Sequence, residues 1–158
     1  LLRGPSSLTE GERELIATVV SHRNECRFCT AAHTAAANIM LGEETTTECV
    51  KIDITSAPVS DKMKALLAIA AQVQISGKAV SPAAITEARE MGATDVEIHD
   101  TVLIAALFCL YNRYVDGLAT VAPADQAFYQ RLGERLKNNG YNRLPGGYDH
   151  LKQPHESH

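Results

Sequence analysis

The sequence contains no tryptophan, and aromatic residues make up only 5% of its 158 residues. Alanine is abundant, and this combination favours closely packed helices over a β-sandwich. No segment of useful length shows the alternating period of a strand. Hydrophobic residues still make up 45% of the chain, which excludes an intrinsically disordered protein. We therefore expect an all-α fold, and the length suits a single domain over residues 1–158.

Features of nucleic-acid-binding and membrane proteins are also missing. The formal net charge is −4, and no basic run is interleaved with aromatic residues, so we expect no nucleic-acid partner. The sequence has no glycine-rich phosphate loop and no apolar stretch long enough to cross a membrane. It shows no secretory signal, although it begins at Leu1 rather than Met, and we expect a cytoplasmic protein.

Start and stop signals along the chain predict about six main helices. Thr9 with Glu12, and Thr94 with Glu97, have the spacing of a capping box, which opens a helix. The expected helices run from Thr9 to the stretch 21–24, from Asn24 to about Leu41, from Ser60 or Asp61 to Gly77, from Ser81 to Gly92, from Thr94 to Gly117, and from about Pro123 to Asn139. We expect a loose lead-in over residues 1–7, a loop or short turns over 43–60, and an irregular tail over 141–158.

Cysteine is the residue type that indicates chemistry. The chain has four cysteines, too few for a secreted disulfide scaffold of this length. Cys26 and Cys29 form a Cys-x-x-Cys pair at the start of a predicted helix, and His33 follows one turn after Cys29. At roughly 100° per residue, the three side chains share one helix face, and Cys29 and His33 are i,i+4 neighbours.

This arrangement is typical of thiol redox chemistry. The positive end of the helix dipole favours thiolate over thiol at Cys26 and Cys29, and thiolate is the form that attacks a peroxide or a disulfide. A neighbouring cysteine can then close a disulfide and so prevent further oxidation. His33 can accept the proton of Cys29 or give one to a leaving hydroxide.

Other interpretations of these residues remain open. Structural zinc would use Cys26, Cys29 and His33, but it would need a fourth ligand from the distant His22 or His99, so we expect no metal and no cofactor. An ordinary core thiol is the better interpretation for Cys109, and a bystander thiol in a loop for Cys49. Asn112 and Asp116 are more typical of structural polar contacts, and Arg113 and Asp116 lie one turn apart, where they can pair. The three histidines of the predicted tail give little evidence of a functional role: His150, His155 and His158.

A longer pattern adds a resemblance to a known family. The pattern consists of Glu14, eleven residues, Cys26-x-x-Cys29, three residues and His33. It resembles the signature of AhpD-like alkylhydroperoxidases, in the carboxymuconolactone decarboxylase superfamily. The stretch 110–118 (LYNRYVDGL), with Pro123 and Gly140-Tyr141, resembles the peroxidase-related enzyme subgroup. The resemblance covers most of the chain, from about residue 8 to residue 141.

The resemblance implies an AhpD-like helical domain assembled as a homo-oligomer, a trimer or larger, such as a hexamer. It implies a proton relay from Glu14 through His33 to Cys29, with Cys29 as the attacking thiolate and Cys26 as the disulfide partner. Phe28 departs from the family pattern, because well-studied members carry a second histidine there. That departure removes one candidate proton donor.

Glu14 is the residue for which helix periodicity and the resemblance disagree. It points away from the apolar stripe of its own helix, so periodicity alone predicts a solvated side chain. Its neighbours at i+3, i+4 and i+7, residues 17, 18 and 21, are small and would let another helix approach. The relay role of Glu14 therefore rests mainly on the resemblance.

The leading hypothesis is an antioxidant thiol enzyme that reduces hydroperoxides or partner disulfides through Cys26 and Cys29. Its partners would be a hydroperoxide substrate and a thiol reductant that the sequence does not identify. One alternative is a non-catalytic redox sensor that uses the same thiol pair. The other is a decarboxylase or lactone enzyme of the same superfamily, although that chemistry needs no cysteine pair.

Overall fold

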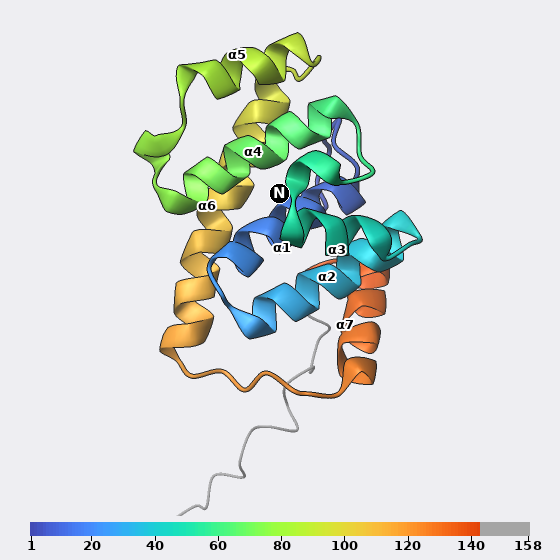
Figure 1. The fold of residues 1–158 in the computed structure, drawn as a ribbon. Helices are drawn as coiled ribbons and strands as arrows, with labels where there is room; N and C mark the ends of the chain where they lie inside the picture. Colours follow the sequence, from blue (N-terminus) through green and yellow to red (C-terminus); the bar gives the residue numbers. More distant parts are fainter. Residues whose placement is uncertain (143–158) are drawn as a thin grey trace, which may run out of the picture.

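A computed structural model describes residues 1–142, which fold into seven α-helices and two short 3₁₀ turns, with no strand among them (Figure 1). The helices are α1 (Glu10–Arg23), α2 (Arg27–Leu41), α3 (Thr45–Ile52), α4 (Asp61–Ile75), α5 (Pro82–Glu90), α6 (Asp95–Gly117) and α7 (Gln126–Asn139), with η1 (Ile54–Ser56) and η2 (Gly77–Ala79) between them. The all-α prediction is confirmed. No helix of the described part is long and apolar enough to span a bilayer.

Helix α1 lies at the centre of this bundle. Figure 1 shows the other helices arranged around it, and α1 contacts α2, α3, α4 and α6. Every residue from Arg13 to Ser21 is buried, so this helix has no solvent face over two turns. Its apolar side chains join those of α4 and α6 in the main hydrophobic core. A polar side chain on α1 therefore needs partners inside the protein.

The helix starts follow the sequence signals closely. Both predicted capping boxes are present, at Thr9 with Glu12 and at Thr94 with Glu97. The side chains of Ser60 and Ser81 cap α4 and α5 by accepting a hydrogen bond from the backbone amide of the third helical residue. Each cap satisfies an amide that would otherwise lack a partner at the helix end.

The start of α2 was predicted wrongly. Asn24 is the C-cap of α1 rather than the N-cap of α2, and its side chain is hydrogen-bonded to Asn112 and Gln74. The chain then reverses at Glu25, whose φ of 58° is in the left-handed region. Cys26 is the N-cap of α2, and Cys29 is therefore the third residue of this helix.

The prediction of a loop or short turns over residues 43–60 was wrong for residues 45–52, which form α3, whereas η1 is a short turn. Thr46, Thr47 and Val50 form the buried side of α3, a stripe that the polar composition concealed. Cys49, expected in a loop, lies on α3 half-buried and packs against the core. The last helix begins at Gln126 rather than near Pro123. With α3 included, the described chain has seven α-helices, against the expected number of about six.

Residues 1–7 form no helix, but they are packed against the bundle. Leu2 is buried, and the guanidinium of Arg13 donates to the carbonyl oxygens of Leu1 and Gly4 at 2.7 and 2.9 Å. These contacts fix the path of the segment over α1. The expectations for the tail beyond residue 142, including its three histidines, lie outside the described residues.

Candidate thiol redox site

The best-defined polar contact in the interior joins α1 to α2. Glu14 Oε2 lies 2.7 Å from His33 Nδ1, and both side chains are buried. The two helices also approach closely near the start of α1 and the end of α2, since a Cβ atom on Gly11 would lie only 3.0 Å from Leu41 Cδ2. Periodicity predicted a solvated Glu14, and this is wrong, because α1 is covered on every side.

Two further groups bind the other oxygen of Glu14. Arg3 Nη2 lies 2.6 Å from Oε1, and the hydroxyl of Tyr141 donates to the same atom at 2.8 Å. Burial alone would raise the pKa of Glu14. The hydrogen bond and charge of His33, the charge of Arg3 and the hydroxyl of Tyr141 outweigh burial and lower that pKa below its ordinary value. Glu14 is therefore a carboxylate at neutral pH.

An ionised carboxylate only accepts hydrogen bonds, so His33 must carry its hydrogen on Nδ1. Its Nε2 is then left to act as the basic nitrogen when the ring is neutral. The imidazole is also held by aromatic rings. Its centroid lies 4.5 Å from that of Phe108 in an edge-on arrangement, and 6.4 Å from that of Tyr141 in a stacked one. Ring orientation and tautomer are thus both fixed by the fold.

The two cysteines of the motif are free and buried at the start of α2. Cys29 precedes His33 by one helical turn, and it is 4% exposed. Burial, followed by the neighbouring Cys29 thiol and the side chain of Asp116, raises the pKa of Cys26 to about 12, although the backbone amide of Cys29 acts in the opposite direction. The expectation that the helix dipole makes Cys26 a thiolate is therefore wrong.

Residues near the motif have structural roles. Asn112 is buried and donates to Ser21 Oγ at 3.1 Å, as expected of a structural contact. Arg113 donates to the carbonyl oxygen of Cys109 at 2.9 Å, and no ion pair joins it to Asp116 within residues 1–142. Cys109 is half-buried against the core.

The structure does not assemble a metal site from the cysteines. Within residues 1–142 no group of three or more His, Cys, Asp or Glu side chains could hold a metal ion. His22 lines a groove elsewhere, and the side chain of His99 is 70% exposed beside Asp100. Neither histidine joins Cys26 and Cys29 as a ligand.

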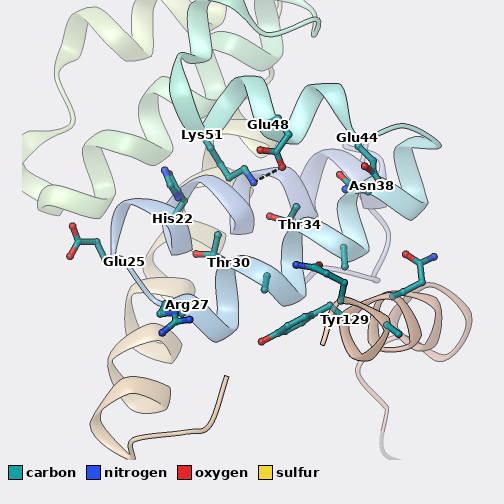
Figure 2. Close-up of a pocket in the computed structure, with 15 residues that line it drawn as sticks. His22, Glu25, Arg27, Thr30, Thr34, Asn38, Glu44, Glu48, Lys51 and Tyr129 are labelled. Atoms are coloured by element: carbon teal, nitrogen blue, oxygen red, sulfur yellow. Dashed lines mark hydrogen bonds and ion pairs between the residues drawn. The ribbon is translucent and has the colours of Figure 1, made fainter. Parts of the chain in front are cut away.

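An open groove of about 910 Å³ lies on the other side of α2. Figure 2 shows its lining side chains, which come mainly from α2, α3 and α7. Thr30, Thr34 and Asn38 face it from α2, whereas Cys26, Cys29 and His33 are not among its lining residues. One helix therefore separates the thiol pair from this groove.

Sequence reasoning missed Arg3 and Tyr141 as neighbours of the Glu14–His33 pair. Arg3 lies in a segment expected to be a loose lead-in. Tyr141 was noted only because Gly140-Tyr141 resembles the peroxidase-related subgroup, and no role at the site was assigned to it. Their contacts with Glu14 span 11 and 127 residues, so no helical period could have indicated them.

Comparisons with known proteins agree with the geometry. The model of the carboxymuconolactone decarboxylase family matches residues 1–47, a range that contains Glu14, Cys26, Cys29 and His33. A search of curated proteins gave no match.

Two solved structures are similar to this chain. The first, an alkylhydroperoxidase AhpD core described as an uncharacterized peroxidase-related protein from Ralstonia eutropha JMP134, is 28% identical with a TM-score of 0.75 over 84% of this chain and 68% of that one. The second, an uncharacterized peroxidase-related protein from Silicibacter sp. TM1040, is 29% identical with a TM-score of 0.73 over 82% and 66%. The chain thus spans about two thirds of each.

The fold and the buried Glu–His pair beside a Cys-x-x-Cys motif define an AhpD-like helical domain. The family match and the two structures together confirm the resemblance to the AhpD-like branch of the carboxymuconolactone decarboxylase superfamily.

Proposed function

We propose that the protein is an antioxidant thiol enzyme that reduces hydroperoxides by cycling Cys26 and Cys29 between dithiol and disulfide. The observation that carries the proposal is the 2.7 Å contact between Glu14 and His33, one helical turn after Cys29. The contact supplies a base with a defined tautomer beside a cysteine in the first turn of a helix. The names of the similar structures, which refer to peroxidases, support the same chemistry.

In the first step, His33 Nε2 takes the proton of the Cys29 thiol, and Glu14 stabilises the resulting imidazolium. The Cys29 thiolate attacks one oxygen of the hydroperoxide and breaks the O–O bond. The sulfur is oxidised to sulfenic acid, and the leaving alkoxide takes the proton from His33 to become an alcohol. The hydroperoxide accepts the two electrons that the sulfur loses.

In the second step, the sulfur of Cys26 attacks the sulfenic acid of Cys29, forming a disulfide and releasing water. The raised pKa of Cys26 keeps it a thiol while Cys29 attacks the hydroperoxide. When Cys26 then attacks the sulfenic acid, its proton leaves with the hydroxide as water. A dithiol reductant then restores both thiols and becomes a disulfide itself. The second activity we propose for this pair is the reduction of a partner disulfide. Cys29 would then form a mixed disulfide with the partner, and Cys26 would release the partner as a dithiol.

The proposal includes a homo-oligomer, as the resemblance implies. Large apolar side chains on the outer face of α6 support it, because they are exposed at helical spacing: Val96, Leu103, Leu110 and Tyr114. A measurement of mass in solution by light scattering tests the assembly. A monomer at micromolar concentration would contradict it.

The deciding experiment compares wild type with Cys29→Ser in a turnover assay. An organic hydroperoxide is supplied with a small dithiol, a thioredoxin-like protein or a lipoyl-type dithiol, and its consumption is followed. Wild type should turn over with at least one reductant, and Cys29→Ser should lose that activity. Cys109→Ser is the control, since this thiol lies outside the motif, and it should retain turnover.

Two results would contradict the proposal. Full activity in Cys29→Ser would mean that the chemistry does not use this thiol. A single oxidation of wild type with no turnover on any reductant would favour the redox-sensor alternative.

A further inference from the structure

Two segments outside the helices meet at one oxygen of Glu14. Arg3, in the segment before α1, and Tyr141, just after α7, both bind Oε1, at 2.6 and 2.8 Å. The opposite oxygen, Oε2, binds His33. The carboxylate is therefore divided, with one oxygen serving the relay and the other held by two donors.

Arg3 is fixed from several directions. Its Nη1 donates to the carbonyl oxygen of Leu2 at 2.9 Å, and its Nε donates to that of Leu136, in the last turn of α7, at 3.2 Å. Its guanidinium also lies over the ring of Tyr141, with 5.1 Å between Cζ and the ring centroid. Arg3 thus connects Glu14 to the end of α7.

Tyr141 is held in an orientation that serves the carboxylate. Its ring is half exposed, but its hydroxyl points into the site, 2.8 Å from Glu14 and 3.4 Å from His33 Nδ1. Burial of the hydroxyl and the charge of Glu14 raise the pKa of Tyr141, so the phenol keeps its proton and donates it. Gly140, with φ of 59°, makes the turn that brings Tyr141 back to the site.

We propose that Arg3 and Tyr141 are positioning residues that set the proton affinity of the thiol site through Glu14. This inference rests on the proposed function. By binding Oε1, the two residues keep Glu14 ionised and in one orientation, which fixes the hydrogen of His33 on Nδ1 and leaves Nε2 for Cys29. They also offset part of the carboxylate's negative charge, which would otherwise strengthen proton binding at His33 and Cys29.

The charged and titratable groups around Glu14 and His33 determine in which direction the pKa values of the site change when Arg3 is removed. They are Arg3 before α1, Glu10 and Glu14 on α1, Cys26 and Cys29 at the start of α2, Asp116 on α6 beside Cys26, and Tyr141 after α7. Arg3 is the only cation among these groups of the described chain besides a protonated His33. Its removal makes the site more negative, so the remaining groups hold their protons to higher pH.

The test measures the reactivity of Cys29 against pH in four variants. Reduced protein is treated with iodoacetamide across about pH 5 to 11, a range that brackets the ordinary imidazole and thiol pKa values and an upward shift of about one unit. Alkylation at Cys29 is quantified by mass spectrometry. Arg3→Gln should move the midpoint of the rate profile upward by roughly one pH unit, because a nearby charge typically shifts a pKa by about 1–3 units.

Tyr141→Phe should move the midpoint in the same direction by a smaller amount, since it removes a hydrogen bond rather than a charge. Arg3→Lys should restore most of the wild-type profile. Tyr111→Phe is the matched control, because Tyr111 is 46% exposed against 47% for Tyr141 and its ring also contacts the site's aromatic residues, at Phe108. Its profile should coincide with that of wild type.

Unchanged midpoints in both Arg3→Gln and Tyr141→Phe, with both variants folded by circular dichroism, would overturn the inference. Alkylation needs no peroxide, so the two proposals can fail separately. If the midpoints shift but no hydroperoxide oxidises Cys29, the proposed function fails and the positioning roles stand. If hydroperoxide oxidises Cys29 and all midpoints coincide, the function stands and the positioning roles fail.

Discussion

Glu14 and His33 are 19 residues apart in the chain, yet Oε2 of the first lies 2.7 Å from Nδ1 of the second. The pair lies inside the protein, where a lone charged carboxylate would be strongly destabilised. Donors on both of its oxygens compensate for that burial. The pair therefore depends on four segments of the chain at once: α1, α2, and the segments before α1 and after α7 that supply Arg3 and Tyr141 to Oε1.

The substitution Glu14→Gln tests the relay directly. An amide can still accept the hydrogen of His33 Nδ1, but it cannot stabilise an imidazolium as a carboxylate does. We expect the oxidation of Cys29 by an organic hydroperoxide to slow by about 10²-fold, the lower end of the range for general acid–base catalysis. Stopped-flow mixing of reduced protein with hydroperoxide measures this rate.

Glu10→Gln is the control for that substitution, because Glu10 is on the same helix and lies 3.7 Å from Arg3 but makes no contact with His33. Its side chain is 43% exposed, so solvent screens its charge, and the variant should react close to the wild-type rate. Equal rates for Glu14→Gln and wild type would remove Glu14 from the mechanism.

The substitution Cys26→Ser tests the division of roles between the two thiols. Without Cys26, the sulfenic acid at Cys29 has no partner in the motif, so it should accumulate and react with dimedone. Mass spectrometry should find the adduct on Cys29 and no disulfide. Cys49→Ser, on α3, should give no adduct, because its Cys26–Cys29 pair is intact. An adduct on Cys26 in Cys29→Ser, formed as fast, would reverse the assigned roles.

Glu97 should make the fold sensitive to acid. Its carboxylate is buried and accepts hydrogen bonds from Lys62 at 2.8 Å, Ser7 at 3.0 Å and the backbone amide of Thr94 at 2.8 Å. Burial alone would raise the pKa of Glu97, but these donors lower it to about 2. Because the folded pKa lies below the ordinary value of 4.5, the contribution is fully present above pH 4.5.

That contribution should be lost as the pH falls from 4.5 towards 2. Urea unfolding at a series of pH values measures it as the slope of the free energy of unfolding. Glu97→Gln should be less stable than wild type at neutral pH and should show a flatter slope over this interval. A slope identical to that of wild type would show that Glu97 is not the responsible group.

Gly133 should be intolerant of a side chain although it lies within a helix. A Cβ atom there would lie 2.7 Å from Ile39 Cδ1 and 3.0 Å from the backbone carbonyl of Ala35, where α7 packs on α2. Alanine usually stabilises a helix interior by about 1 kcal/mol relative to glycine. We expect Gly133→Ala to destabilise instead, by about 1–3 kcal/mol, because the backbone of α2 cannot move aside.

Gly117→Ala is the matched control, since a Cβ atom at the end of α6 would have no neighbour within 4 Å. Thermal unfolding of both variants measures the difference. If Gly133→Ala melts at or above the wild-type temperature, the contact between α2 and α7 is looser than described.

Capping residues made most of the fold predictable. Thr9 and Thr94 opened their helices as expected, because a capping box is a local signal that tertiary contacts seldom override. Asn24 is the case in which the cap signal failed. It is a good cap by composition, but its side chain is taken by Asn112, a partner 88 residues away. The missed helix α3 shows the other limit, since its buried threonines were interpreted as loop residues.

The site was predictable only where its residues share a helix. Cys26, Cys29 and His33 could be grouped from their spacing alone. Glu14 could not, because a helix that is buried on all sides has no solvent face for its period to indicate. Arg3 and Tyr141 reach Glu14 from irregular segments, and the path of such segments depends on contacts that no sequence period encodes.

The position of Cys26 at the N-cap of α2 has an energetic consequence for redox cycling. A disulfide between residues 26 and 29 would close a loop within one helical turn, and the stabilisation from restricting an unfolded chain grows with the logarithm of loop length. For so short a loop it amounts to about 2 kcal/mol, against about 4.7 kcal/mol for a 100-residue loop. Forming or breaking this bond therefore changes the free energy of unfolding by less than a bond that closes a long loop would. A cystine between distant helices would instead couple every catalytic cycle to the stability of the whole fold.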